Sequence, residues 1–149
     1  EQRKLKRMEH AHLLRQGVFA GFPDTQLARL VKAGEWRSYE AGTVLTRQGK
    51  PVAELVLICD GEALVEAENV VVARLHGGAF VGEMAFVSGN PASATVIVAQ
   101  PTRAFVFDIE RLRKLVDADD LVAVAVHRVV GRDLATKLKA RNDEVTAAA

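Results

Sequence analysis

The stretch that decides the fold runs from Gly77 to Val96 and reads GGAFVGEMAFVSGNPASATV. The paired glycines Gly77 and Gly78 end one extended segment, and a short helix then begins at Gly82-Glu83. A glycine at that point lets a ligand approach the backbone closely, and the free N–H groups at a helix start can donate to phosphate or hydroxyl groups. Glu83 is placed to accept hydrogen bonds from a diol, and Ser93 adds a hydroxyl. The residue types indicate either a ligand-binding cradle or a turn that only closes a β structure.

Short apolar runs separated by turn residues surround this stretch. They extend from Glu35 to Phe107 and are rich in Val, Leu, Ile and Phe. About seven or eight such runs, spaced by roughly ten residues, predict an antiparallel sandwich or closed roll over residues 35–107. Asp60-Gly61 between two of the runs predicts a tight hairpin.

Helical periodicity precedes the predicted roll. Residues 1–16 are charged and modestly amphipathic, with Leu5 and Met8 among the apolar positions. A second helix is predicted at residues 24–33, with Asp24 as its cap and Gly34 as its stop.

Helical periodicity also returns after the predicted roll. Asp108 is the predicted cap of one helix, and a longer helix is predicted near residues 120–140, followed by a frayed tail at residues 142–149. The longer helix carries an apolar stripe that we expect to pack on the roll or on a second copy of the chain. The stripe consists of Val122, Val126, Val129, Val130, Leu134 and Leu138.

Composition narrows the class of protein. The chain has 149 residues, 49% hydrophobic and 26% charged, and a formal net charge of +1, so its bulk charge gives no reason to expect a nucleic-acid partner. No apolar run approaches the roughly 20 residues of a membrane helix. The single cysteine, Cys59, fits a reducing compartment. We therefore expect a cytoplasmic location. The first residue, Glu1, is not methionine, which suggests a piece of a longer chain.

Catalysis is not indicated by the reactive residue types. Cys59 lies in the apolar run LVLIC and is predicted to be a packing residue, and none of Ser38, Ser88 and Ser93 has a G-x-S-x-G context. We expect no metal or other cofactor, because the histidines do not converge. They are His10, His12, His76 and His127.

The span from Gly17 to Arg141 resembles the cyclic nucleotide-binding domain family. The resemblance is carried by YEAGTVLTRQGKPVAELVLICDGEALV at residues 39–65 and by the cassette at residues 77–96. It implies an α+β fold, an antiparallel β-roll of the double-stranded jelly-roll type, flanked by N-terminal helices and a C-terminal lid helix. It also implies that Gly82 and Glu83 hold a ribose 2′-hydroxyl and that backbone N–H groups near Ala85 and Ser93 face a cyclic phosphate. The expected ligand-binding residues are Phe80, Val81, Gly82, Glu83, Met84, Ala85, Ala92, Ser93, Ala94 and Thr95.

One position departs from the family pattern. The family places an arginine directly after the cassette proline, where it pairs with the phosphate, and this chain has Ala92 after Pro91. Losing one side of a buried charge pair costs roughly 2–5 kcal/mol, so binding is expected to be weakened. Arg74 and Arg103 are either substitute cations or solvated surface residues.

Two functions remain open. The first is a regulatory sensor domain that binds cyclic AMP weakly and relays binding through its C-terminal helix. The second is a related module that no longer binds nucleotide and serves in interaction or dimerisation. The expected organisation is an N-terminal helix or linker at residues 1–16, the domain at 17–141 and the tail at 142–149. Expected partners are a cyclic nucleotide, a second copy of the chain through the C-terminal helix, and an attached membrane or effector domain, with no nucleic acid.

Overall fold

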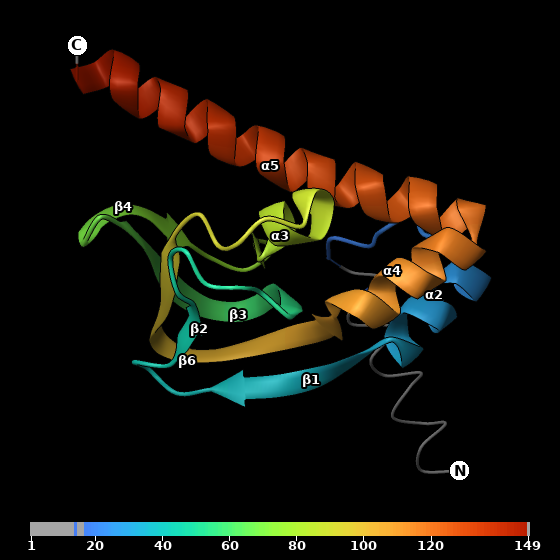
Figure 1. Ribbon diagram of the computed structural model, residues 1–149. Coiled ribbons are helices and arrows are strands. Elements are labelled where there is room, and N and C mark those ends of the chain that lie inside the picture. The colour runs from blue at the N-terminus through green and yellow to red at the C-terminus, as the bar shows by residue number, and fades with distance from the viewer. Residues whose placement is uncertain (1–13, 15–16, 149) are drawn as a thin grey trace.

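The computed structural model describes Leu14 and residues 17–148, with side chains through Lys139. Helices lie at both ends of this part of the chain, and strands lie between them (Figure 1). In chain order, the elements are α2 (Asp24–Lys32), β1 (Gly34–Tyr39), β2 (Val44–Thr46), β3 (Glu54–Ala67), β4 (Val70–Leu75), β5 (Phe80–Val81), α3 (Glu83–Ser88), β6 (Thr95–Asp108), α4 (Ile109–Ala118) and α5 (Asp120–Ala148).

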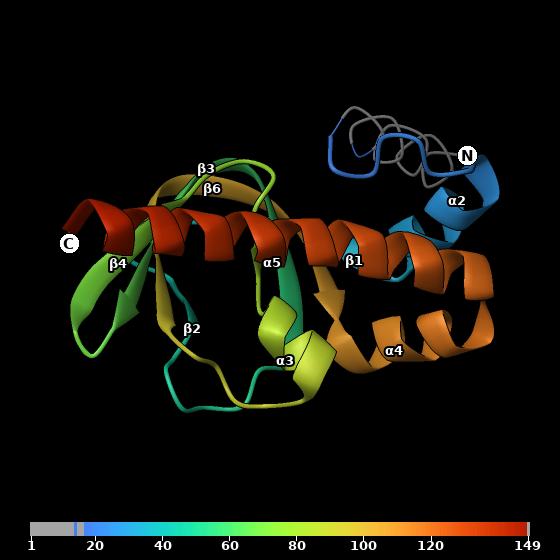
Figure 2. The same cartoon turned by 90° about the horizontal axis from the view of Figure 1, so that it is seen from above.

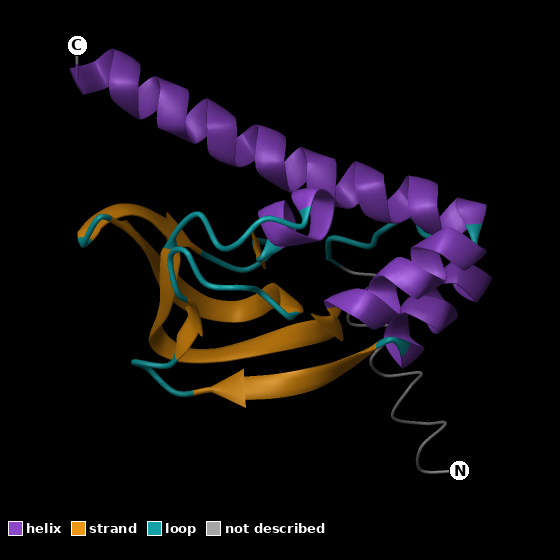
Figure 3. Cartoon of the chain, viewed as in Figure 1, coloured by secondary structure: helices purple, strands orange, loops and turns teal. Residues whose placement is uncertain are grey.

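The strands form one curled antiparallel sheet, as the sequence predicted. Its strand order is β1-β6-β3-β4, while β2 pairs with β6 and β5 pairs with β3. Figure 3 shows the strands grouped on one side and the long α5 helix crossing above them. The predicted fold class is confirmed: an antiparallel roll with flanking helices and a helical lid.

The predicted hairpin at Asp60-Gly61 is wrong. These residues lie inside β3, which pairs with β6 along nearly its whole length and shifts register between Ile58 and Ala63. Gly61 has a φ of 130°, and a Cβ there would lie 2.2 Å from Thr102 Oγ1, so glycine permits this close crossing of the two strands. The Asp60-Gly61 dipeptide thus marks an irregularity at which the paired strands β3 and β6 bend together, and the chain does not reverse there.

The reversal between β3 and β4 falls at Glu68-Asn69 instead. Their φ values of 53° and 64° are both positive, as a two-residue primed turn requires. The runs on either side of Gln100 also merge, into β6. Two mergers of this kind explain why the described sheet has six strands rather than seven or eight.

β3 is buried on both faces because the core lies on either side of it. Leu55 and Leu57 pack into the larger apolar cluster, beneath the helices, while Val56 and Ile58 pack into the smaller cluster inside the roll. Successive strand residues point to opposite faces, so one apolar run can serve both clusters.

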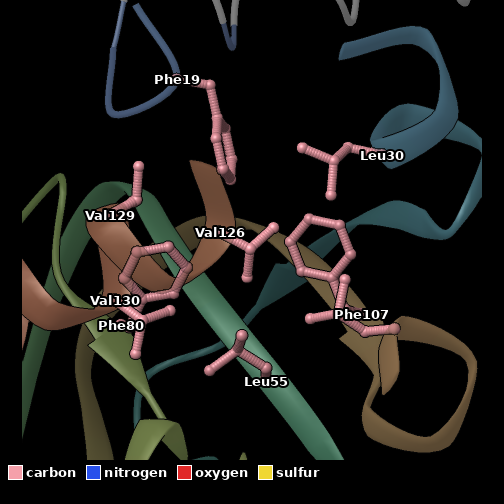
Figure 4. A pocket seen from close by; sticks show the side chains of 9 residues that line it. Phe19, Leu30, Leu55, Phe80, Phe107, Val126, Val129 and Val130 are labelled. Atoms are coloured by element: carbon pink, nitrogen blue, oxygen red, sulfur yellow. The ribbon is translucent and has the colours of Figure 1, made fainter. Parts of the chain in front are cut away.

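The apolar stripe of α5 packs against the roll. Val122, Val126, Val129 and Val130 are buried, Leu134 is half-buried, and Leu138 remains 61% exposed. Figure 4 shows the valines of α5 facing aromatic side chains around a cavity of about 10 Å³. Each buried valine contributes about 1.5–3 kcal/mol relative to exposure. Packing on the roll therefore accounts for most of the stripe, and Leu138 is the exception.

The helix boundaries agree with the prediction in part. Asp108 caps α4 by accepting a hydrogen bond from Arg111 N at 3.0 Å. Asp24 lies in the first turn of α2 rather than at its cap, which is Pro23, and α2 ends at Lys32 before Gly34 opens β1. The helical backbone of α5 continues to Ala148, past the predicted end near residue 140.

The two helices at the C-terminal end are joined at Asp119. Its carboxylate accepts from the backbone N–H groups of Leu121 and Val122, each at 3.1 Å, and forms an ion pair with Arg29 of α2. This junction fixes the start of α5 against α2. Within the described residues, no helix is long and apolar enough to span a membrane. The N-terminal helix predicted at residues 1–16 lies outside the described residues except for Leu14, which is helical and buried.

Candidate ligand-binding site

The cassette predicted from the sequence is a short helix held between two left-handed glycines. α3 begins after Gly82, with φ of 92°, and ends before Gly89, with φ of 76°. A Cβ on Gly82 would lie 2.7 Å from the carbonyl oxygen of Glu54. Glycine is therefore required there both by its backbone conformation and by the close approach of the first residue of β3.

Glu83 is a buried carboxylate in the first turn of α3. Its side chain is only 8% exposed, and it forms an ion pair with Lys137 of α5. A buried charge is costly unless it is paired, so Lys137 stabilises the ionised carboxylate at this position. The residue expected to bind a ligand is thus in direct contact with the lid helix.

Lys137 is surrounded by acceptors. Besides Glu83, its ammonium donates to the carbonyl oxygen of Phe80 at 2.6 Å and lies 2.8 Å from Asp133 Oδ2. Asp133 Oδ1 in turn accepts from Phe80 N at 3.4 Å. Figure 1 shows α3 below the middle of α5, and Figure 2, seen from above, shows α3 beside α5. One turn of α5 is therefore fastened to both β5 and α3.

The electrostatics of this site are set by burial. Burial raises the pKa of Glu83 above its ordinary value, and the charge and hydrogen bond of Lys137 oppose that rise without cancelling it. The nearby carboxylate of Asp133 adds a smaller upward contribution. The carboxylate of Glu83 consequently depends on its contact with α5 to remain ionised.

The far end of the cassette is fixed by the loop after β2. Ala92 N donates to Lys50 O at 2.9 Å, and Gly49 N donates to Ala92 O at 2.8 Å. Thr46 Oγ1 donates to Ala94 O at 3.0 Å, and Gln48 N donates to Thr95 Oγ1 at 2.9 Å. The backbone of Ala92 is thus fully engaged by the neighbouring loop.

The structure places the ten predicted site residues on one continuous segment but with different exposure. Phe80, Val81, Glu83 and Ala85 are buried, Met84 and Ser93 are exposed, and Gly82, Ala92, Ala94 and Thr95 are half-buried. Phe80 belongs to the apolar core as well, because it packs edge-on against Phe19.

The two candidate substitute cations do not serve the cassette. Arg74 donates to Glu62 Oε1 at 2.7 Å, and Arg103 stacks over the ring of Trp36 with 4.6 Å between its guanidinium carbon and the ring centroid. Both arginines lie on other parts of the sheet. Of the two readings left open by the sequence, the surface role fits these contacts.

Sequence reasoning missed the residues that connect α3 to the helices. Lys137 and Asp133 were not singled out, although their i, i+4 spacing on a helix is a recognisable ion-pair signal. Arg113 of α4 was also missed; it donates to the carbonyl oxygens of Ala85 at 2.9 Å and Phe86 at 3.2 Å. Nothing in the local pattern reveals these long-range partners.

A second, larger hollow adjoins the cassette, because its lining residues Val52 and Glu54 approach Gly82 and its lining residue Thr46 donates to Ala94 O. Its volume is about 340 Å³, and it lies between β2, the start of β3 and Asp108. Within the described part of the chain, no group of three or more His, Cys, Asp or Glu side chains could hold a metal ion.

A helix-flanked roll with a cassette helix beneath a C-terminal lid is the architecture of a regulatory ligand-binding module. The chain belongs to the cyclic nucleotide-binding domain family, whose model matches residues 36–119, more than half of the chain. Domains of this family are regulatory rather than catalytic.

Several known proteins are similar to this chain. A cyclic nucleotide-gated potassium channel of Mesorhizobium japonicum is 41% identical over 73 residues, which are 49% of this chain and 20% of the channel. The chain spans 20% to 30% of the length of the first curated relatives that it matches.

Solved structures share the fold. A cyclic nucleotide-binding domain from Methylobacillus flagellatus KT has a TM-score of 0.84 at 21% identity, covering 95% of this chain and 85% of that one. The structure of Sp-2Cl-cAMPS bound to PKAR CBD2 has a TM-score of 0.76 at 17% identity, covering 94% and 92% respectively. At these identities the likeness establishes the fold.

Proposed function

We propose that this domain is a sensor that binds a cyclic nucleotide, cyclic AMP in the first instance, in the cassette of residues 80–95. Binding is relayed through α5 to an attached membrane or effector domain. Support comes from family membership, from the channel relative and from the solved relative that carries a cyclic AMP analogue.

The observation that carries the proposal is the contact between Glu83 and Lys137. Glu83 is the acceptor that the family pattern assigns to the ribose, and here it pairs with a residue on the lid helix. A ligand whose hydroxyl donates a hydrogen bond to Glu83 changes the partners of Lys137. Because Lys137 also contacts Phe80 and Asp133, the same event changes how α5 is fastened to the roll.

A second link ties the cassette to the preceding helix. Arg113 of α4 holds the carbonyl oxygens of Ala85 and Phe86, and Phe86 lies 6.3 Å from the ring of His127 on α5, centroid to centroid. Movement of α3 on binding would therefore reach both α4 and α5.

One observation favours the alternative, an interaction or dimerisation module without a nucleotide. Ala92 supplies no cation, and its backbone N–H and carbonyl are already bonded to the loop at residues 49–50. Under this alternative the contact between Glu83 and Lys137 is a permanent structural pair.

Calorimetric titration of the purified chain with cyclic AMP and cyclic GMP separates the two functions. We expect saturable binding of cyclic AMP that is weakened by Glu83→Gln, which removes the ionised acceptor while keeping the side-chain shape. Hydrogen exchange of the α5 amides should change on binding. Absence of binding at millimolar nucleotide, with a folded protein, would favour the interaction module.

A further inference from the structure

The groups around Glu83 have spare hydrogen-bond acceptors but no spare cationic donor. The ammonium of Lys137 donates to the carbonyl oxygen of Phe80 at 2.6 Å and to the carboxylate of Glu83, and it forms an ion pair with Asp133 Oδ2 at 2.8 Å. Three oxygens of the chain therefore already surround the charge of Lys137.

The three charged groups in contact at Glu83 have a net charge of the wrong sign for an anion. Two carboxylates, Glu83 and Asp133, flank one ammonium, which gives a net charge of −1 when both are ionised. Their side chains are only 8% and 11% exposed, so solvent screens them weakly. Each carboxylate can accept more hydrogen bonds than it does here, because Glu83 accepts from Lys137 while Asp133 accepts from Phe80 N and its Oδ2 accepts none.

The remaining described cations near the cassette are not free donors for a phosphate. The guanidinium of Arg113 keeps its charge, but it donates to the carbonyl oxygens of Ala85 and Phe86. Arg47 and Lys50, in the loop that holds Ala92, are exposed, where attraction between charges is weak.

We infer that the cassette prefers an uncharged ribonucleoside with a free 2′,3′-cis-diol to a 3′,5′-cyclic nucleotide. The inference rests on the proposed function, because it concerns the ligand of the same site. A nucleoside offers two hydroxyl donors to the spare acceptors of Glu83 and Asp133 and brings no charge. A cyclic nucleotide has one free ribose hydroxyl, because its 3′ oxygen is esterified, and it brings a phosphate anion beside a cluster that is already negative.

Calorimetry with adenosine and cyclic AMP tests this inference directly on the full chain. We expect adenosine to bind at least about tenfold more tightly than cyclic AMP. The phosphate of cyclic AMP lacks the charge-assisted contact that an arginine at the position of Ala92 would supply. We expect 2′-deoxyadenosine and 3′-deoxyadenosine each to bind more weakly than adenosine. The 3′-deoxy ligand is the sharper probe, because a site built for a cyclic phosphate has no use for a free 3′-hydroxyl.

A variant with one carboxylate fewer near Glu83 should bind cyclic AMP more tightly, a gain that general damage to the fold would not produce. Asp133→Asn removes one negative charge, so it should narrow the preference for adenosine by strengthening cyclic AMP binding. Asp117→Asn is the matched control, because Asp117 is an exposed aspartate on α4, and it should leave the preference unchanged.

The outcomes separate this inference from the proposed function. Tighter binding of cyclic AMP than of adenosine would overturn the inference and leave the cyclic-nucleotide sensor intact. Binding of neither ligand by a folded chain would overturn both. Tighter binding of adenosine, with loss of affinity for the 3′-deoxy ligand, supports the inference.

Discussion

Replacing Ala92 with arginine restores the cation that the family pattern places after the cassette proline. The backbone at this position is fixed by two hydrogen bonds to the loop, Ala92 N to Lys50 O at 2.9 Å and Gly49 N to Ala92 O at 2.8 Å. Ala92 is half-buried, so a longer side chain does not have to displace the core. The substitution therefore adds a charged side chain at a position whose backbone is already fixed.

The expected magnitude follows from one charge-assisted hydrogen bond to the phosphate. Such a bond contributes about 1.5–3 kcal/mol net, which is roughly a ten- to hundredfold gain in affinity for cyclic AMP. Adenosine has no phosphate, so its affinity should change little. The substitution should thus move the preference of the site from the nucleoside toward the cyclic nucleotide.

Isothermal calorimetry of wild type, Ala92→Arg and Ala92→Gln measures this gain. The glutamine variant is the control, because it adds a long polar side chain without a charge. Glu83→Ala in the arginine background should remove much of the gain, since the ribose loses its acceptor. Cyclic AMP affinity in Ala92→Arg equal to that of wild type would refute the reasoning and show that the pocket is closed or reshaped.

Three further predictions concern stability and reactivity. Val130→Asp, which places a carboxylate at a position only 2% exposed, should lower the melting temperature sharply, whereas Leu138→Asp at 61% exposure should not; equal melting of the two would contradict the packing of α5 on the roll. Lys137→Met should further raise the already raised pKa of Glu83, so its stability deficit relative to wild type should be smallest below the ordinary carboxyl pKa of 4.5 and grow as pH rises toward neutrality, in chemical denaturation at a series of pH values; a deficit that does not vary with pH would count against it. Burial raises the pKa of the Cys59 thiol to about 11, so the folded chain should react with a thiol reagent at pH 8 far more slowly than the unfolded chain.

The cassette and the helix signals were predictable because each depends on residues close together in the sequence. Gly82-Glu83 marks a left-handed residue before a helix, and the Asp108 side chain accepts a hydrogen bond from the N–H group of Arg111, three residues further on. The apolar stripe of α5 follows from a 3.6-residue period. Local spacing fixes such features whatever surrounds them.

The long strands could not be predicted in the same way. Asp60-Gly61 has the composition of a hairpin turn, yet Gly61 sits opposite Thr102 in a bend shared by β3 and β6. Whether a glycine reverses the chain or relieves a crossing depends on the partner strand, some 40 residues away in the sequence.

The sequence by itself determined the roll, the cassette and the absence of an arginine at Ala92, because residue type and local period are enough for each. Only the tertiary structure decided what Glu83 contacts. Its partner Lys137 lies 54 residues further along the chain, and the two meet because the valines of α5 dock on the roll and bring that face of the helix over α3. The charge and spare hydrogen-bonding capacity of the site follow from that docking, which no local pattern encodes.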